Sequence, residues 1–395
     1  MKKLKSALKK YPLAYACYNI YKKQSVIFET IKLRMACKYI KKDSLPTIEE
    51  AYRVLDSLRP GPKQDFYGSN VNIDENTDLT IIIPVYNAEL FLEKCLNSVV
   101  EQKSDYKISV ICVNDGSNDS SAAILNKFAD NDSFEIIHQN NMGHSGARNT
   151  ALEKKIGKYL MFIDSDDYLG GNYIKKMLDT AFKNDADIVQ SGFKKCNARS
   201  VELDTIECKN GVIGSYDELE RFGGAPWGRI YKSSLWDGIR YPVGMMFEDT
   251  IIFNLIFRRA KKVVGVSDTY YMYRVYGNNT LDKLQGDKRL LDAVWSVKYV
   301  YEMAKRLGME RDEKYYVFFL EQCSKHVYYR IRHFDNKVQK ACFVILCNMV
   351  NDFNADRRTI GKERGFVLRE LENSFNERNF SKWIICSNIL KKTSG

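Results

Sequence analysis

Short apolar runs that alternate with segments of helical spacing constrain the fold of this 395-residue chain most strongly. From Leu79 onward, five runs of strand length are rich in Ile and Val, and they cover residues 79–85, 107–113, 134–137, 159–163 and 187–189. Apolar runs without polar alternation are typical of parallel strands that are buried on both faces. The segments between them have helical spacing, as Leu92, Leu96 and Val99 illustrate. The pattern predicts an α/β domain: a doubly wound, Rossmann-like, mostly parallel sheet with helices on both faces.

Beyond residue 283 the strand pattern stops, and apolar residues recur only at helical spacing. The three clearest series are Leu290, Val294, Val297 and Tyr301; Val317, Leu320, Val327 and Ile331; and Val338, Cys342, Ile345 and Met349. This spacing predicts a helical subdomain. We therefore expect three parts: a basic helical arm and connector over residues 1–78, the α/β domain over 79–282, and the helical subdomain over 283–395.

The net charge of +11 is confined to the N-terminal arm. Residues 1–42 contain eleven Lys, Arg34 and a single acid, Glu29, so the rest of the chain is neutral. A nucleic-acid-binding protein would normally carry its basic face on the folded domain, so we expect no nucleic-acid partner. The arm either lies on an anionic membrane surface or packs on the body as a helix with solvated charges. Residues 43–78 resemble a connector, with Pro46, Pro60, Gly61 and Pro62.

The cysteine pattern indicates a reducing compartment. Ten cysteines are scattered without a C-x-x-C pair, and only four histidines are present, without zinc-ligand spacing. A large neutral body with unpaired thiols is typical of the cytosol. Because no run of about 18 apolar residues occurs, we expect a cytoplasmic protein, peripheral at the inner face of the membrane if the arm binds lipid.

Polar residues follow four of the predicted strands, at residues 84–87, 114–117, 140–149 and 164–167. Ligands of an open parallel sheet bind outside the carboxyl ends of its strands, so these clusters converge. The Asp115 carboxylate can accept hydrogen bonds from a base N–H or a ribose hydroxyl, and Gly116 lets the backbone approach a ligand closely. Gly143 and Gly146 open a helix whose amides favour an anion, and Arg148 offers a fixed cation.

Three acids in the last cluster, Asp164, Asp166 and Asp167, narrow the class of ligand. Alone, such a run is more often a solvated turn. Directly after a buried strand, and on the same edge as Asp115 and Arg148, it favours a divalent metal, Mg²⁺ or Mn²⁺, held between carboxylates and substrate phosphates. The G-x-G-x-x-G, P-loop and G-x-S-x-G motifs are all missing, which weighs against dinucleotide oxidoreductases, P-loop ATPases and serine hydrolases.

A further acidic pair, Glu248-Asp249, precedes an apolar helical run. Asp249 is a favourable helix N-cap, and the same carboxylate can act as general base toward an acceptor hydroxyl. The two roles are compatible because a capped helix start holds the carboxylate in a fixed position.

Taken together, these residues resemble glycosyltransferase family 2, whose members have the GT-A nucleotide-sugar-binding fold. The matching stretches, which span roughly residues 79–280, are Ile83-Pro84-Val85-Tyr86-Asn87, Val113-Asn114-Asp115-Gly116-Ser117, Asn141-x-Gly143-x-Ser145-x-Ala147-Arg148-Asn149, Phe162-Ile163-Asp164-Ser165-Asp166-Asp167, Pro226-Trp227 with Tyr231-Lys232, Phe247-Glu248-Asp249 and Tyr271-x-Tyr273-Arg274. The sequence departs from the family pattern in two places: Asn114 stands where many members have Asp, and Gly228-Arg229 follows Trp227 where a Lys is often found.

The resemblance implies a role for each matching residue. Pro84, Tyr86, Asn87 and Asp115 would contact the nucleoside, with Asp115 on the base, and Arg148 would line the nucleoside-diphosphate site. Asp164, with Ser165 beside it, would face the ribose, and Asp166 would bind the metal. Arg274 would help to hold the diphosphate. Glu248 would lie beside the acceptor, and Asp249 would be the catalytic base.

The resemblance further implies an inverting transfer from a nucleoside-diphosphate sugar, with UDP as the expected nucleotide, to a hydroxyl of a glycan or lipid-linked acceptor in bacterial polysaccharide synthesis. Two alternatives stay open. One is a non-catalytic nucleotide-sugar-binding or assembly protein, and the other is a nucleotidyltransferase built on a similar sheet.

Overall fold

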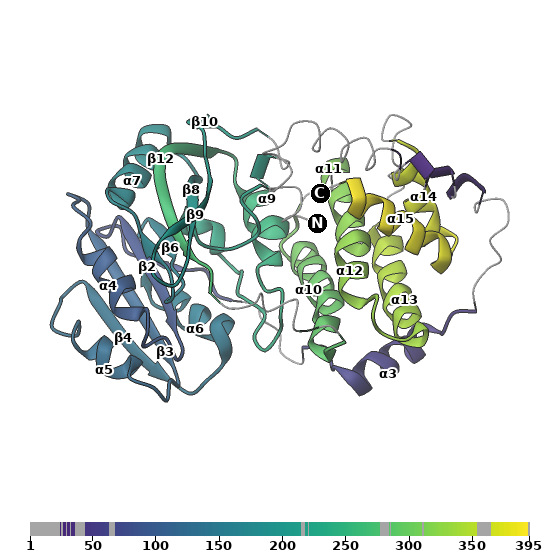
Figure 1. Ribbon diagram of the computed structural model, residues 1–395, viewed down its shortest axis with the longest axis horizontal. Coiled ribbons are helices and arrows are strands. Elements are labelled where there is room, and N and C mark those ends of the chain that lie inside the picture. The colour runs from purple at the N-terminus through teal and green to yellow at the C-terminus, as the bar shows by residue number, and fades with distance from the viewer. Residues whose placement is uncertain are drawn as a thin grey trace. The chain divides into compact units, whose positions relative to one another are not determined.

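The computed structural model describes residues 44–62, 68–214, 218–219, 221–276, 284, 286–309, 312–353 and 365–393, with scattered positions between 24 and 35. The chain divides into two compact units (Figure 1). The sheet unit comprises residues 62–283 and 302–309, and the helical unit comprises residues 1–61, 284–301 and 310–395. The predicted basic arm lies almost entirely outside the described residues.

One half of the central sheet is parallel and contains the buried runs that the sequence predicts. Its strands run side by side in the order β6, β2, β3, β4. Their bounds are β2 Leu79–Val85, β3 Ile108–Asp115, β4 Phe134–Gln139 and β6 Tyr159–Phe162. All seven residues of β2 are buried, as expected for a central strand covered on both faces. The carboxyl ends of these strands therefore meet at one edge, which is where the polar clusters follow.

The other half of the sheet mixes directions. Strand β11 (Arg229–Lys232) lies antiparallel between β6 and β8 (Ile188–Cys196), and β12 (Val263–Arg274) pairs parallel with β8. Short strands complete the sheet: β7 Tyr168–Leu169, β9 Glu202–Ile206 and β10 Gly211–Val212. A separate parallel pair joins β1 (Asn72–Ile73) to β5 (Lys155–Ile156). The α/β class and its parallel core confirm the prediction, whereas β11 and β12 were not predicted as strands.

Helices flank the sheet (Figure 1), and the hydrophobic core includes buried residues from three of them, α4, α5 and α7. They are α4 Leu92–Val100, α5 Ser121–Asn126, α6 Gly143–Leu152, α7 Tyr173–Asn184 and the short α9 Phe257–Arg259, with a 3₁₀ turn at Ser233–Trp236 and a π-helical segment at Ile252–Ile256. The predicted series Leu92, Leu96 and Val99 is the buried face of α4.

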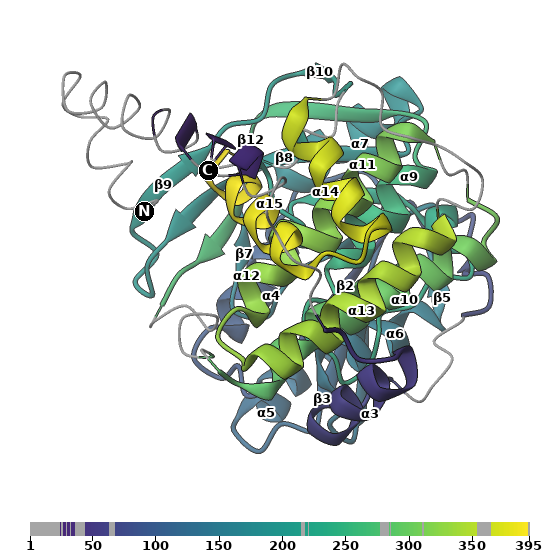
Figure 2. The ribbon, with the colours of Figure 1, turned by 90° about the vertical axis from the view of Figure 1, so that its right-hand side faces the viewer.

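The helical unit confirms the predicted C-terminal helices (Figure 2). Its helices are α10 Asp292–Arg306, α11 Glu313–Glu321, α12 Val327–Ile331, α13 Asn336–Phe353, α14 Phe366–Asn376 and α15 Phe380–Thr393, with a 3₁₀ turn at Lys288–Leu291 and a π-helical segment at Gln322–His326. The last turn of α10 is grouped with the sheet unit. None of the helices described by the structure has the length and apolar content that crossing a bilayer requires.

The segment expected to be a connector contains a well-capped helix, α3 (Ile48–Leu58). The Thr47 hydroxyl accepts from the Glu50 amide at 3.2 Å, and the Glu50 carboxylate accepts from the Thr47 amide at 2.9 Å. This capping box satisfies two amides that a helix start leaves unpaired. Helix α3 packs on α13 within the helical unit (Figure 2). Residues 44–61 therefore belong with the C-terminal helices.

Candidate active site

The loop after β2 is tied to the loop after β3 through Asn87. Pro84 is buried inside β2, while Tyr86 and Asn87 follow it and are exposed. Asn87 adopts a left-handed backbone with φ of 47°. Its amide donates to the Ser117 hydroxyl at 3.1 Å, and its side-chain oxygen accepts from the Asn118 amide at 3.0 Å. The two predicted nucleoside loops are thus held together, with the Tyr86 ring left in solvent.

Asp115 ends β3 and is almost fully buried, with 1% of its surface exposed. Its Oδ1 accepts from the Gln139 side-chain amide at 2.7 Å and from the Met142 amide at 2.8 Å. Its Oδ2 is buried and has no hydrogen-bond partner in the described part of the chain. A buried carboxylate oxygen without a donor is costly, so this atom is available to a ligand donor.

Gly116 allows the chain to turn directly after Asp115. Its φ is 73°, and a Cβ atom at this position would lie 2.9 Å from the Asn141 amide nitrogen. A side chain would therefore be strained and would push apart the loops that follow β3 and β4.

Arg148 is the electrostatic centre of the cluster. It lies on α6, and only 4% of its surface is exposed. One terminal nitrogen donates to the Asp164 carboxylate at 2.7 Å, and the other lies 3.4 Å from the Glu248 carboxylate. Burial by itself would lower the pKa of Arg148, but the neighbouring charges, Asp164 foremost, outweigh it and raise the pKa. The guanidinium thus joins residues separated by up to 100 positions in the chain.

Glu248 is held from a second side by His144. The His144 Nε2 atom lies 2.7 Å from the same Glu248 oxygen that contacts Arg148. Burial raises the pKa of Glu248, but the hydrogen bond and charge of His144, together with Arg148, outweigh burial and lower it. Glu248 therefore stays ionised and fixed in orientation. His144 was not among the predicted site residues.

The turn after β6 presents four polar side chains with different partners. Asp164 contacts Arg148, its backbone amide donates to the Tyr271 hydroxyl at 3.1 Å, and Ser165 beside it is half-buried. Asp166 accepts from the Tyr276 hydroxyl at 2.8 Å. Burial and then the charge of Asp164 raise the pKa of Asp166, so the two carboxylates are close enough to repel.

Asp167 has a structural role instead. It is 1% exposed, and its carboxylate accepts from the Tyr271 hydroxyl at 2.8 Å and from the Arg274 amide at 2.7 Å. Burial, followed by the charges of Asp164 and Asp166, raises its pKa well above the ordinary value. Asp167 thereby fixes the end of β12 beside the acidic turn.

The Arg274 side chain sits at the end of β12 with 3% of its surface exposed. Its guanidinium lies over the Phe91 ring at 4.3 Å and over the Tyr168 ring at 5.2 Å. Its Nε and Nη1 atoms are buried without a partner among the described residues. A buried cation with unused donors is a suitable binding group for an anion.

Asp249 follows Glu248 but faces a different neighbour. It is half-buried, and a Cβ atom at position 224 would lie 3.4 Å from its Oδ2 atom. The loop that contains Gly224 is held by the fully buried Arg229, whose guanidinium donates to the Gly223 carbonyl at 2.7 Å and also to the Ala225 carbonyl and the Gln190 side chain. Arg229 therefore stabilises the loop against which Asp249 lies.

The structure joins Arg148, Asp164 and Glu248 by direct contact and connects Asp166, Asp167 and Arg274 to them through the acidic turn and its tyrosines. Asp115 joins the same region through the Met142 amide, which lies just before α6. In the part of the chain that the structure describes, no group of three or more metal-ligating side chains comes together.

Comparison with known proteins first defines the class. The fold resembles that of Staphylococcus aureus TarS, residues 1–349, with a TM-score of 0.60 and 18% sequence identity over 80% of this chain and 92% of that chain. TarS shares the GT-A-like arrangement of a curled sheet and helices. Residues 80–236 match the sequence model of Glycosyl transferase family 2. Over this segment, which is less than half of the chain, the protein is similar to glycosyltransferase family 2.

Curated relatives agree with this family. Glycosyltransferase GlyA of Streptococcus pneumoniae is 30% identical over 58% of this chain, and the uncharacterized glycosyltransferase EpsJ of Bacillus subtilis is 33% identical over 51%. The poly(ribitol-phosphate) beta-glucosyltransferase of Bacillus spizizenii is 33% identical over 50% of this chain. These matches span 34%, 62% and 32% of the respective relatives, so a large part of each relative has no counterpart here.

Proposed function

We propose that the protein transfers a sugar from a nucleoside-diphosphate sugar to a hydroxyl of a glycan or lipid-linked acceptor, with inversion at the anomeric carbon. The match of residues 80–236 to the family 2 model and the names of the curated relatives support a glycosyltransferase over the two alternatives. The observation that carries the proposal is a set of buried polar atoms without partners in the described part of the chain: Asp115 Oδ2 together with Arg274 Nε and Nη1. Such atoms destabilise a fold unless a ligand satisfies them.

The chemistry of these atoms fits a nucleoside diphosphate. Asp115 Oδ2 is an acceptor suited to the N–H of a base, and the Arg274 donors are suited to a diphosphate oxygen. Uracil offers such an N–H, and TarS has been solved with UDP and with UDP-GlcNAc, which supports UDP as the nucleotide. In this proposal Pro84, Tyr86, Asn87 and Gly116 border the nucleoside, and Asp164 with Ser165 faces the ribose.

A divalent cation, Mn²⁺ or Mg²⁺, fits the acidic turn. Asp166 and Asp164 repel each other and a diphosphate would add further negative charge, so a cation between them is favourable. Asp166 is the proposed protein ligand, and the substrate phosphates complete the set. When bound, the cation offsets the negative charge that develops on the leaving diphosphate.

Asp249 is the proposed general base. As the acceptor hydroxyl attacks the anomeric carbon, Asp249 takes its proton, and the nucleoside diphosphate departs from the opposite face beside Arg148 and Arg274. Glu248 orients the acceptor instead of accepting the proton, because His144 and Arg148 already engage its Oε1 atom. A single displacement of this kind needs no second carboxylate as nucleophile and gives inversion.

The names of the relatives support an acceptor class. Their names include a poly(ribitol-phosphate) glucosyltransferase and a minor teichoic acid biosynthesis protein, which supports a cell-envelope polysaccharide or its lipid-linked precursor as acceptor. Catalysis by the predicted domain of residues 79–282 and membrane association through residues 1–42 form part of the same proposal.

The test is an assay of nucleoside-diphosphate release with a panel of donors and acceptors. We expect release to require a divalent cation and to increase when acceptor is added. Asp249→Asn should keep donor binding and reduce turnover at least about 1,000-fold, since it removes the base. Asp166→Ala should weaken metal-dependent donor binding, with the exposed Asp130→Asn as control. Undiminished turnover in both site variants would refute the assigned roles.

A further inference from the structure

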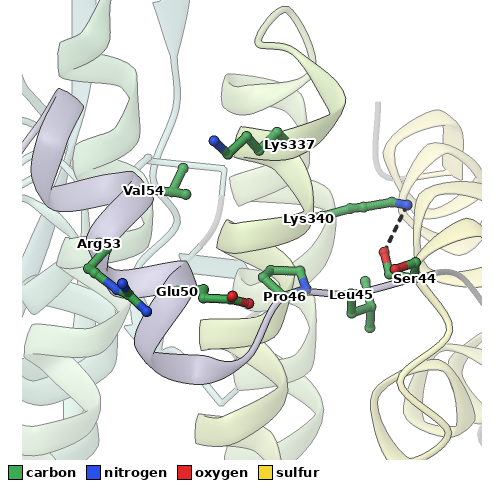
Figure 3. Close-up of a pocket in the computed structure, with 8 residues that line it drawn as sticks. All are labelled: Ser44, Leu45, Pro46, Glu50, Arg53, Val54, Lys337 and Lys340. Atoms are coloured by element: carbon green, nitrogen blue, oxygen red, sulfur yellow. Dashed lines mark hydrogen bonds between the residues drawn. The ribbon is translucent and has the colours of Figure 1, made fainter.

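The helical unit contains a pocket whose lining includes none of the nucleotide-sugar residues. A pocket of about 490 Å³ lies against the first turns of α3 and α13 (Figure 3). It is lined by Ser44, Leu45, Pro46, Glu50, Arg53, Val54, Lys337 and Lys340. Its volume is sufficient for a phosphorylated polar headgroup.

Three bases and one acid line this pocket. The acid, Glu50, turns its carboxylate to the Thr47 amide at 2.9 Å as part of the capping box, so part of its hydrogen-bonding capacity is used in the protein. Lys340 donates to the Ser44 carbonyl at 3.1 Å, which joins α13 to the segment before α3 (Figure 3). Arg53 lies one turn after Glu49 and helps to lower its pKa, after the Glu49 amide and the Thr47 hydroxyl. The lining thus carries an excess of positive charge.

The placement of the lysines is not explained by the stability of α13. Lys337 and Lys340 lie near its N-terminus, where the helix dipole disfavours cations. No acid lies in the first turn of this described helix to compensate. The Asp335 side chain accepts from the Val338 amide at 2.8 Å, so the start is capped without them. Bases that oppose the dipole at a pocket rim are expected where an anion binds.

We propose that this pocket binds the phosphate of an anionic phospholipid headgroup and thereby docks the helical unit on a membrane surface. Arg53 supplies a planar fork that can hold two phosphate oxygens, and Lys337 supplies a point charge.

The position of the pocket in the chain favours a lipid over a soluble phosphate. The pocket begins at Ser44, directly after the stretch of residues 1–42 that contains eleven Lys and Arg34. Two linked attachment elements bind more tightly than either one alone, here a polybasic segment on an anionic surface and a site for the lipid headgroup. A polybasic stretch followed at once by a phosphate pocket provides both.

The test is co-sedimentation of the full chain with vesicles of phosphatidylcholine alone or with phosphatidylglycerol added. We expect binding only to the anionic vesicles and a decrease with salt. The variant Arg53→Gln/Lys337→Gln should bind roughly 25-fold more weakly, since each of the two bases near such a surface contributes about fivefold. Lys103→Gln/Lys183→Gln, two exposed lysines of the sheet unit, removes the same charge elsewhere and should change binding less than about twofold.

Each outcome decides the proposal. An equal loss in the two double variants would indicate charge attraction without a site and would overturn it, as would unchanged binding of the pocket variant. Soluble glycerol phosphate serves as the competing probe. Suppose that the wild type binds glycerol phosphate, that the pocket variant does not, and that neither binds anionic vesicles. The pocket then binds a soluble phosphorylated glycan, and the lipid assignment is wrong. Unaltered circular dichroism of both variants establishes that they fold.

Discussion

Asp115 combines a structural and a binding role in one side chain. Its Oδ1 fixes the loop before α6 through the Met142 amide, while its Oδ2 has no described partner. Because the first contact is strong, the second oxygen is held in one orientation before any ligand arrives. Preorganisation of this kind reduces the entropy that binding costs.

The variant Asp115→Asn tests the free oxygen directly. If the amide keeps its oxygen toward Met142 and Gln139, it presents an N–H where the base N–H must bind, and the two donors repel. We expect uridine-nucleotide affinity to fall about 10- to 100-fold, the range for one mismatched buried hydrogen bond. Isothermal titration calorimetry with UDP measures this affinity. Equal affinity of wild type and Asp115→Asn would mean that Asp115 does not contact the base.

At the residue scale, the sequence identified the groups that follow strands but not their partners. Asp115, Arg148, Asp164 and Glu248 could be named because they stand after buried runs or in family motifs. His144 and Tyr276 could not, since their contacts with Glu248 and Asp166 join residues more than 100 positions apart. The structural role of Asp167 was missed for the same reason. For His144, the only sequence signal of a role in the site was its position inside the Asn141–Asn149 motif.

At the element scale, the buried strands and amphipathic helices were predictable, and the mixed half of the sheet was not. Strand β11 has four residues, two of them basic, so its sequence lacks an apolar run. Strand β12 is long but contains a register shift between Val266 and Tyr270 that interrupts its pattern. Helix α3 was mistaken for connector because prolines flank it on both sides.

Arg229 stabilises the loop beside Asp249, so its replacement tests how elements position the proposed base. Lys cannot reproduce three donors in a planar fork. We expect Arg229→Lys to lower the free energy of unfolding by about 2–4 kcal/mol, because buried carbonyl oxygens lose their donors. Acceptor KM should rise more than donor KM. Urea unfolding measures the change in stability and steady-state kinetics measures the two KM values, with the exposed Arg199→Lys as control. Unchanged stability would contradict the assigned role.

The capping box of α3 allows a second test at this scale. Thr47→Ala removes the hydroxyl that accepts from the Glu50 amide, and we expect a loss of about 1 kcal/mol in the free energy of unfolding of the helical unit. Thr47→Ser keeps the hydroxyl and should lose much less. Chemical denaturation of both variants provides the comparison, and equal losses would show that the cap contributes nothing.

At the scale of the whole molecule, the two units differ in what their buried ionisable groups do. In the sheet unit, Asp115 and Arg274 are buried and face the proposed ligand, whereas His326 in the helical unit has no assigned ligand role. Burial, assisted by the charges of Lys325, Arg330 and Lys391, lowers the pKa of His326 to about 3. The folded protein therefore keeps this ring neutral where an unfolded chain would protonate it.

His326 should make stability depend on pH. Its contribution is complete above the ordinary pKa of about 6.5 and is lost as pH falls toward 3, because the unfolded state binds the extra proton. The slope it adds is at most about 1.4 kcal/mol per pH unit. We expect His326→Gln to flatten the profile of unfolding free energy between pH 6.5 and 4.5, and exposed His333→Gln to leave it unchanged. Parallel profiles for all three proteins would contradict this account.

A crystal structure of the protein with UDP and Mn²⁺ tests most directly whether the polar clusters at one sheet edge form a single nucleotide-sugar site. We predict the base N–H on Asp115 Oδ2, the diphosphate within reach of the Arg274 guanidinium, and the cation on Asp166. A nucleotide bound at another place, or bound at this edge without contact to Asp115 and Arg274, would contradict the account.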